Sequence, residues 1–198
     1  CNLFCSISTV KLSAVIPVND RPVPVLNSVF ASMREQAFDE LVIVLDAPPA
    51  ETLAFCNNYD WRGCSGEVKK VPRLRAPGWR SPVKAWNAGF AALTGDALYA
   101  FSSETIQAPG NLRRAKAMLE EREAVYFGAA SCSCGPTGQE VNWLGTAPGN
   151  LLCDAAHPRP LGFIWAAPIK HVRHIRGFDE AFDAGWWYDD NCIFYRLW

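Results

Sequence analysis

The sequence has few of the residues on which small secreted or metal-stapled proteins depend. Its 198 residues include three histidines and eight cysteines, and no two cysteines form a Cys-x-x-Cys pair. A chain of this length can bury a core without disulfides or structural zinc. We therefore interpret the cysteines as mostly reduced thiols of a cytoplasmic protein, while their even number leaves one or two disulfides open.

A strong net charge and a long apolar run are also missing. The formal net charge is −1, which makes nucleic acid and anionic membranes unfavoured partners. No apolar stretch approaches the roughly 20 residues that cross a bilayer, so no membrane span is expected. No secretory signal pattern opens the chain, and its first residue is Cys, which leaves open a processed or trimmed start.

Several common catalytic motifs do not occur either. The sequence contains no Gly-x-Gly-x-x-Gly, no Walker loop and no Gly-x-Ser-x-Gly, which argues against the enzyme classes that these motifs define. His171 and His174 are three residues apart, but no carboxylate at suitable spacing completes a metal site with them. We expect them to lie on a basic surface.

Apolar runs do occur, and they alternate with stretches of helical periodicity. We expect strands at 11–18, 41–45, 68–71, 97–101, 124–130 and 161–167, and helices at 22–36, 51–58, 83–93, 109–121 and 169–175. This alternation predicts one α/β domain over residues 1–198, with a mostly parallel central sheet flanked by helices. Residues 1–10 are a candidate extension. Open sheets of this kind bind ligands at the carboxyl ends of their strands.

Four segments of the chain occur in a distinctive order. The first combines SAVIPVNDRP with ELVIVLDAPP, and the second is SPVKAWNAGFAALTGDALYAF. The third is FSSETIQAPGNL, and the fourth is IRGFDEAFDAGWWYDDNCIFYRL. Together they resemble the inverting nucleotide-sugar glycosyltransferases of family 2, which have the GT-A fold, over roughly residues 11–197. Members of that family usually continue with helices that bind the acceptor. We expect none within these residues, which leaves open a minimal enzyme, a trimmed larger protein or a partner that completes the acceptor site.

The first segment corresponds to the part of the family that holds the nucleotide. The resemblance implies that Pro17, Val18 and Asp20 line the nucleotide pocket. It also implies that Asp46 reaches the base or the ribose. Alternatively, Asp20 caps a helix and Asp46 simply forms a turn.

The second segment suggests a contact with the diphosphate. By resemblance, Lys84 faces the diphosphate, and Asn87 falls at a position that the family also uses. A basic run leads into this segment and comprises Lys69, Lys70, Arg73, Arg75, Arg80 and Lys84. Cationic side chains can hold a diphosphate through charge-assisted hydrogen bonds, although the run can equally be a solvated surface loop.

The third segment departs most from the family. Aligned from Pro109, residues Ser102, Ser103 and Glu104 fall where the family has Asp-x-Asp. In the family that motif binds Mn²⁺ or Mg²⁺ beside the sugar diphosphate, so the resemblance implies a divalent cation at Glu104. Alternatively, the two serines form a turn and Glu104 lies in solvent.

The fourth segment carries the most specific signal. The resemblance makes Asp190 the general base that deprotonates the acceptor hydroxyl, with Asp189 beside it contacting the acceptor or orienting the loop. The aromatic side chains of residues 186–188 would then form platforms for sugar rings. Alternatively, the two acids cap a final helix.

The resemblance therefore predicts an inverting glycosyltransferase that acts on a nucleotide-sugar donor and a glycan or other hydroxyl acceptor. The main alternative is a degenerate relative that binds a nucleotide or glycan without turnover, since Ser102 and Cys192 occupy acidic positions of the family. A nucleotidyltransferase would need a Gly-rich loop after the first strand, which PVNDRPVP does not provide. An enzyme acting on modified DNA gains no support from the near-neutral charge.

Overall fold

The structure is a computed structural model, and it describes residues 10–75, 78, 80–127, 164–185 and 189–197. Within these residues, six strands form one sheet in the order β3-β2-β1-β4-β6-β5. The strands are β1 Leu12–Val18, β2 Glu40–Asp46, β3 Glu67–Arg73, β4 Ala97–Phe101, β5 Tyr126–Phe127 and β6 Ile164–Pro168. Strands β3, β2, β1 and β4 are parallel, and β6 is antiparallel to both β4 and β5. The predicted mostly parallel sheet is confirmed.

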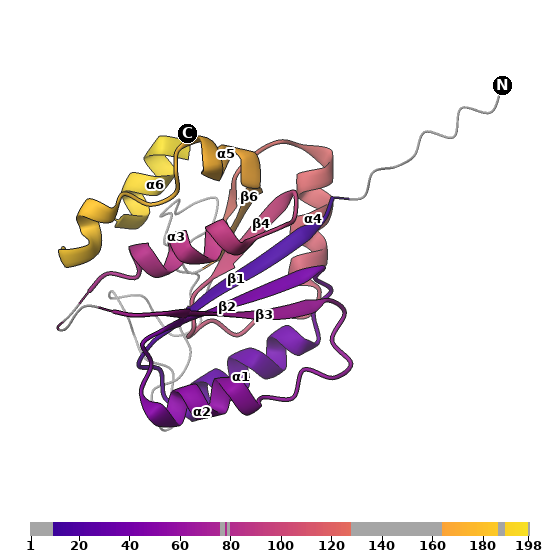
Figure 1. Cartoon of the computed structure of the whole chain (residues 1–198). Helices are drawn as coiled ribbons and strands as arrows, with labels where there is room; N and C mark the ends of the chain where they lie inside the picture. Colours follow the sequence, from indigo (N-terminus) through magenta and orange to yellow (C-terminus); the bar gives the residue numbers. More distant parts are fainter. Residues whose placement is uncertain (1–9, 76–77, 79, 128–163, 186–188, 198) are drawn as a thin grey trace, which may run out of the picture.

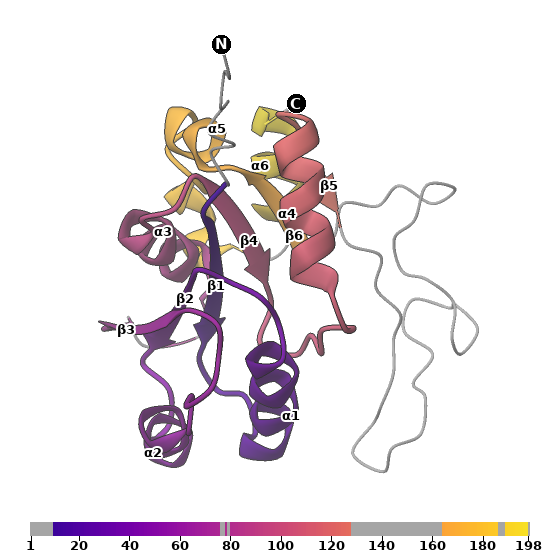
Figure 2. The same cartoon turned by 90° about the vertical axis from the view of Figure 1, so that its right-hand side faces the viewer.

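Helices cover both faces of this sheet (Figures 1 and 2). They are α1 Val23–Arg34, α2 Ala50–Asn58, α3 Val83–Ala92, α4 Asn111–Glu121, α5 Ile169–His174, the 3-10 helix η2 Glu180–Ala184 and α6 Asp189–Leu197. Side chains of α1, α2 and α4 pack on one face of the sheet, and side chains of α3, α5 and α6 pack on the other. The described part of the chain is thus a three-layer α/β/α structure.

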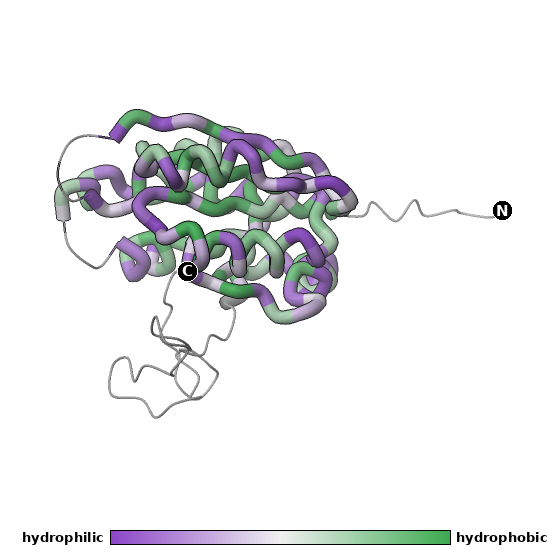
Figure 3. The backbone as a smooth tube through the Cα atoms, turned by 90° about the horizontal axis from the view of Figure 1, so that it is seen from below, coloured by the Kyte–Doolittle hydropathy of each residue, from purple (hydrophilic) through white to green (hydrophobic). Residues whose placement is uncertain are grey.

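The central strands form because they are apolar on both faces. Every residue of β1, β2 and β4 is buried, as expected for parallel strands covered by helices on each side. The helices instead bury one stripe. In α1 the buried residues Leu26, Val29, Phe30 and Met33 follow helical spacing. Figure 3 shows the resulting change between hydrophobic and hydrophilic residues along the helices.

The second half of the chain differs most from the sequence-based expectations. The strand expected at 161–167 is observed as Ile164–Pro168, and it runs antiparallel to β4. Of the strand expected at 124–130, Tyr126–Phe127 is observed, and residues 128–130 lie outside the described part. Helix α4 begins two residues after Pro109, because Gly110 at its N-cap adopts a left-handed conformation with φ 76°. The helix η2 was not expected.

Three cysteines lie in the described residues, and all three are free thiols: Cys56, Cys64 and Cys192. Cys56 lies on the buried side of α2, and this burial raises the pKa of its thiol to about 11. A thiol with so high a pKa is a poor nucleophile at neutral pH, so Cys56 contributes packing rather than chemistry. The other cysteines, and the predicted aromatic platforms at 186–188, lie outside the described residues.

Candidate active site

The carboxyl ends of four parallel strands form one edge of the sheet. Arg73, Asp46 and Val18 end β3, β2 and β1, and β4 ends at Phe101 just before Ser102. Pro17 and Val18 are buried within β1, whereas Asp20 is exposed just beyond it. The structure therefore brings the predicted nucleotide-binding and metal-binding residues to one edge, which we call the carboxyl edge.

Asp46 is the most buried acid of the carboxyl edge. Its residue surface is 1% exposed, and its carboxylate is paired with two arginines. Arg73, at the end of β3, pairs with Oδ1, and Nη1 of Arg75 lies 3.3 Å from Oδ2. Both carboxylate oxygens therefore face guanidinium groups. In this arrangement Asp46 orients Arg73 and Arg75, and its predicted contact with the base or ribose stays a prediction.

A chain of contacts leads from Asp46 to the acidic pair at the start of α6. Arg75, which pairs with Asp46, also donates a hydrogen bond to the backbone carbonyl of Arg80. The next residue is Ser81, whose hydroxyl donates to Oδ2 of Asp189 over 2.6 Å. Asp189 and Asp190 form the first turn of α6. The acidic pair therefore lies at the carboxyl edge, on the same side of the molecule as Asp46.

Asp183 is a further acid at this edge, and the sequence did not predict it as a site residue. It lies in η2 and is 9% exposed. Its Oδ2 is 3.1 Å from Nζ of Lys84 and 3.8 Å from Nε of Arg80. Its Oδ1 is buried and makes no hydrogen bond with the described residues. The only signal in the sequence was an acid placed between two apolar residues, Phe182 and Ala184.

Asn87 fixes the path by which the chain returns to the carboxyl edge. Its side-chain amide accepts a hydrogen bond from the backbone N–H of Phe178 and donates to the Phe178 carbonyl, over 2.8 and 2.9 Å. It also donates to Glu180 over 3.1 Å. Gly177 has φ 71°, and a Cβ there would lie 2.3 Å from Oδ1 of Asn87. Asn87 thus holds the turn that precedes η2, and its predicted part in the nucleotide site stays a prediction.

Glu104 and the two serines before it form the part of the edge that follows β4. Nη2 of Arg21 lies 2.8 Å from Oε2 of Glu104, and Nε of Arg21 donates to Oγ of Ser103 over 3.3 Å. The Ser102 hydroxyl is hydrogen-bonded to Thr105 over 2.8 Å. In the described residues, no group of three or more His, Cys, Asp or Glu side chains is placed to hold a metal ion.

This donor set does not fit the predicted divalent cation. Mg²⁺ and Mn²⁺ favour several oxygen ligands, with carboxylates prominent among them. Glu104 is the one carboxylate among the three residues, and a guanidinium already occupies it. A second cation at that carboxylate would be repelled by Arg21.

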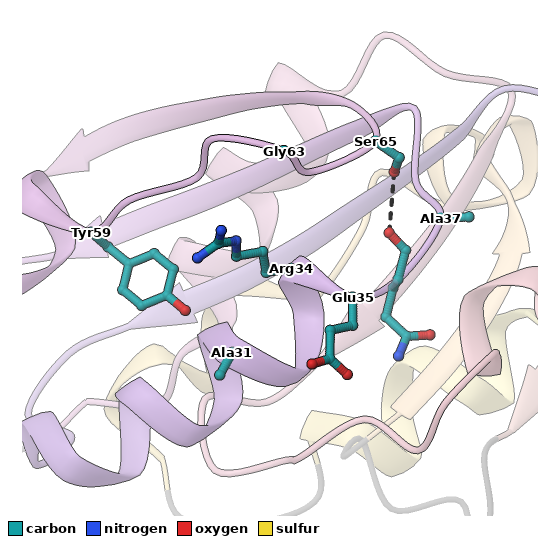
Figure 4. Close-up of a pocket in the computed structure, with 8 residues that line it drawn as sticks. Ala31, Arg34, Glu35, Ala37, Tyr59, Gly63 and Ser65 are labelled. Carbon is teal, nitrogen blue, oxygen red and sulfur yellow. Dashed lines mark hydrogen bonds between the residues drawn. The ribbon is translucent and has the colours of Figure 1, made fainter.

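An open pocket of about 690 Å³ lies at the opposite edge of the sheet (Figure 4). It is lined by residues from the end of α1 and from the segment between α2 and β3, including Arg34, Tyr59 and Ser65. The hydroxyl of Ser65 donates to the carbonyl of Gln36 in its wall over 3.1 Å. None of the predicted site residues lines this pocket.

The parallel strands, the two helix layers and the antiparallel β6 define a fold of the GT-A type, found in glycosyltransferases. The sequence matches no known family profile and no curated protein. The structure of S. aureus TarS residues 1–349 matches 94% of this chain and 55% of that chain, with 17% identity and a TM-score of 0.64. The mannosyltransferase PcManGT from Pyrobaculum calidifontis matches 88% of this chain and 50% of that chain, with 17% identity and a TM-score of 0.60. The GT-A fold expected from the sequence is confirmed.

The solved structures show what these neighbours bind. TarS has been solved with UDP and with UDP-GlcNAc, and PcManGT has been solved with GDP-Man and Mn²⁺. The chain spans about half the length of the TarS 1–349 and PcManGT chains that it matches. At 16–18% identity the likeness establishes the fold and leaves the reaction to be argued from the site. Across the described residues, no helix has the length and apolar character that a bilayer crossing requires.

Proposed function

We propose that the carboxyl edge binds a nucleotide-sugar donor and transfers its sugar to a hydroxyl acceptor with inversion at the anomeric carbon. The observation that supports this most directly is the hydrogen bond from Ser81 to Asp189, at 2.6 Å. It ties the acidic start of α6 to Ser81, which directly follows Arg80 in the chain. This closeness supports the proposal, because transfer from a sugar diphosphate needs both a base and cations beside the leaving group.

The chemistry requires a base and charge neutralisation. The acceptor oxygen forms a bond to the anomeric carbon while the bond from that carbon to the β-phosphate oxygen breaks. The acceptor proton goes to Asp190, and the bonding electrons leave with the nucleoside diphosphate. Attack from the face opposite the leaving group inverts the anomeric centre. Asp189 holds the start of α6 against Ser81, so it positions Asp190.

Cationic side chains would neutralise the diphosphate. Lys84 and Arg80 share Asp183, and Arg73 and Arg75 share Asp46. Because each pair of cations shares one carboxylate, each pair keeps positive charge for a ligand. The neighbour PcManGT was solved with Mn²⁺, but the residues around Glu104 do not fit a divalent cation, so this proposal includes no metal-dependent step.

The test is release of nucleoside diphosphate from a panel of UDP- and GDP-sugars with hydroxyl acceptors. We expect Asp190→Asn to lower kcat by roughly 10²–10⁴-fold, as loss of a general base does, without weakening nucleotide binding. The control is Asp60→Asn, which makes the same chemical change in an exposed ion pair with Arg62. Its activity should equal that of the unaltered protein. Equal turnover by Asp190→Asn would refute the role of Asp190.

The alternative, a module that binds nucleotides without turnover, is favoured by Ser102 and Cys192 at positions that are acidic in the family. It predicts that UDP or GDP raises the thermal stability of the protein while no donor releases its sugar. If no nucleotide shifts the melting temperature and no donor turns over, both functions are excluded.

A further inference from the structure

The side chain of Arg21 crosses from the end of β1 to the end of β4. Its guanidinium is held by Glu104 at 2.8 Å and by Ser103 at 3.3 Å. Its backbone carbonyl accepts a hydrogen bond from the Thr52 hydroxyl over 3.1 Å, which fixes the residue at the start of α2. The side chains of Arg21 and Glu104 are 40% and 39% exposed, so this pair is open to a ligand.

This guanidinium lies beside the two residues that depart from the acidic motif of the resembled family, Ser102 and Glu104. Ser102 stands where the resembled family has its first metal-binding acid, and its hydroxyl is engaged by Thr105. Glu104 stands at the second acid, and its carboxylate is engaged by Arg21. The negative charge of the expected metal site is thus halved, and a fixed positive charge is added.

We propose that Arg21, held by Glu104 and Ser103, contacts the diphosphate of the donor in place of a divalent cation. This inference rests on the proposed function. Arginine suits the task, because its planar fork of N–H donors matches phosphate oxygens and keeps its charge at all working pH values. Nη2 and Nε of Arg21 are engaged by Glu104 and Ser103. The N–H groups of Nη1 have no hydrogen-bond partner among the described residues, and they can donate to a phosphate oxygen.

The other ion pairs of the edge supply the remaining charge. Arg21, Arg73, Arg75, Arg80 and Lys84 share three carboxylates, those of Glu104, Asp46 and Asp183. Within these ion pairs alone the positive side chains outnumber the carboxylates by two, while Asp20, Asp189 and Asp190 at the same edge contribute negative charge. As the bond to the β-phosphate oxygen breaks, its electron pair is stabilised by these donors.

The experiment measures UDP and GDP affinity by calorimetry, in EDTA and in Mn²⁺, with the full chain. We expect the unaltered protein to bind with affinities that agree within about threefold between the two conditions. Arg21→Gln should weaken binding about tenfold or more in both. Arg21→Lys, which keeps the charge and loses the fork, should fall in between. The control is Arg62→Gln, which breaks an arginine–carboxylate pair of the same 2.8 Å length at an exposed site.

Glu104→Gln separates the two roles of Glu104 most sharply. If Glu104 only seats Arg21, its neutralisation leaves a charged arginine that Ser103 still holds through Nε. Because the lost ion pair is exposed, affinity in EDTA should stay within about threefold or rise. If Glu104 binds metal, Mn²⁺ raises the affinity of the unaltered protein more than about tenfold, and Glu104→Gln abolishes that gain. Titration of Mn²⁺ alone, followed by electron paramagnetic resonance, adds a measurement that needs no variant and should show no bound ion.

The two proposals fail in different ways. Nucleotide binding that depends on Mn²⁺ and Glu104 overturns the role of Arg21 and leaves the proposed transfer standing. Equal affinity of Arg21→Gln and the unaltered protein in EDTA has the same meaning. If no UDP or GDP binding occurs in either condition to a protein that remains folded, the proposed function fails, and the role of Arg21 fails with it.

Discussion

Strand β2 begins and ends with a buried carboxylate. Glu40 at its start has no exposed surface, and Asp46 at its end is 1% exposed. Both sites are buried, yet the partners differ in kind. Glu40 is surrounded mainly by neutral donors at the amino edge of the sheet, whereas Asp46 is surrounded by arginines at the carboxyl edge.

The partners of Glu40 come from three different elements. The Ser13 hydroxyl donates to Oε2 over 2.5 Å, and Nζ of Lys69 lies 2.6 Å from Oε1. Thr94 donates through both its backbone N–H and its hydroxyl, over 2.9 and 3.1 Å. Burial alone would raise the pKa of Glu40, but the bonds from Lys69, Ser13 and Thr94 outweigh it and lower the pKa to about 2. These contacts tie β2 to β1, to β3 and to the segment that follows α3.

The contacts of Asp46 lead outward instead. Arg73 and Arg75 each pair with it, and Arg75 continues to the backbone of Arg80. From there Ser81 reaches Asp189. A buried acid whose donors are mostly neutral serves stability, whereas one that orients several cations at the surface is placed to serve a ligand. Burial by itself does not distinguish the two cases.

The largest loss of stability is expected from Gly177→Ala. This substitution disturbs the turn through which the chain returns to the carboxyl edge before η2. Gly177 has φ 71°, and the new Cβ would lie 2.3 Å from Oδ1 of Asn87. A side chain in the left-handed region costs about 1–2 kcal/mol, and displacement of Asn87 adds its lost hydrogen bonds. We expect the free energy of unfolding to fall by about 3 kcal/mol, measured by urea denaturation.

Gly63→Ala is the matched control for this change. Gly63 has φ 83°, but no atom lies within 4 Å of the position of its Cβ. It should therefore lose about 1 kcal/mol, from backbone strain alone. Equal losses at Gly63 and Gly177 would mean that Asn87 yields easily and does not fix the turn.

The next largest effect is expected from Glu40→Gln. The substitution keeps the shape of the side chain, removes its charge, and leaves Lys69 with only the more exposed carboxylate of Glu67, 3.4 Å away. We expect a loss of about 2 kcal/mol in the free energy of unfolding, because hydrogen bonds to a buried charged group are lost. Nucleotide affinity should not change, since no contact of Glu40 leads to the carboxyl edge.

Glu67→Gln provides the comparison for Glu40. Glu67 lies 3.4 Å from the same lysine, but its side chain is 65% exposed. An exposed pair contributes less than about 1 kcal/mol, so its loss should be barely measurable. A loss as large as that of Glu40→Gln would show that the lysine, rather than the burial of Glu40, carries the stability.

Asp46→Asn should affect nucleotide affinity more than stability, which is the opposite of Glu40→Gln. Arg73 and Arg75 would lose the group that orients them, and nucleoside diphosphate affinity should fall about tenfold, which corresponds to about 1.4 kcal/mol. The free energy of unfolding should fall by less than for Glu40→Gln, because the two arginine side chains are 17% and 15% exposed and can reach water. The reverse result, intact affinity and a large loss of stability, would show that Asp46 stabilises the fold as Glu40 does and does not serve nucleotide binding.

Much of the fold could be predicted from the sequence, because the central strands are uninterrupted apolar runs. The stretch LVIVL is short, uniformly apolar and rich in β-branched residues, which indicates a strand buried on both faces. The direction of β6 could not be predicted. It depends on how the chain returns after residue 127, and an apolar run has no direction of its own.

The location of some candidate site residues, though not their contacts, could also be predicted from the strands. Asp46 and Glu104 could be found because parallel strands end at one edge. Their roles could not be found, because each depends on a partner distant in sequence. Arg73 is 27 residues from Asp46, and Phe178 is 91 residues from Asn87. The resemblance predicts nucleotide-site roles for Asp46 and Asn87, and these stay predictions. The geometry adds partners that the sequence did not indicate, two arginines for Asp46 and the Phe178 backbone for Asn87.

The smallest expected effect concerns acid pH and sharpens the contrast at β2. The pKa of Glu40 is about 2 in the folded protein and near its ordinary value of 4.5 in the unfolded chain. A lowered folded pKa means that stabilisation by Glu40 is complete well above pH 4.5 and is lost as the pH falls toward 2. Between pH 5 and pH 3.5 we expect about 1 kcal/mol of this contribution to disappear.

Urea denaturation of the unaltered protein and of Glu40→Gln between pH 5 and pH 3.5 isolates the contribution of the Glu40 carboxylate to stability. Other carboxylates titrate in both proteins, so only the difference between the two curves belongs to Glu40. That difference should shrink as the pH falls, because glutamine mimics the protonated acid. Parallel curves for Glu40→Gln would mean that the carboxyl group has the same pKa in the folded and unfolded chains, and that its hydrogen bonds only compensate for its burial.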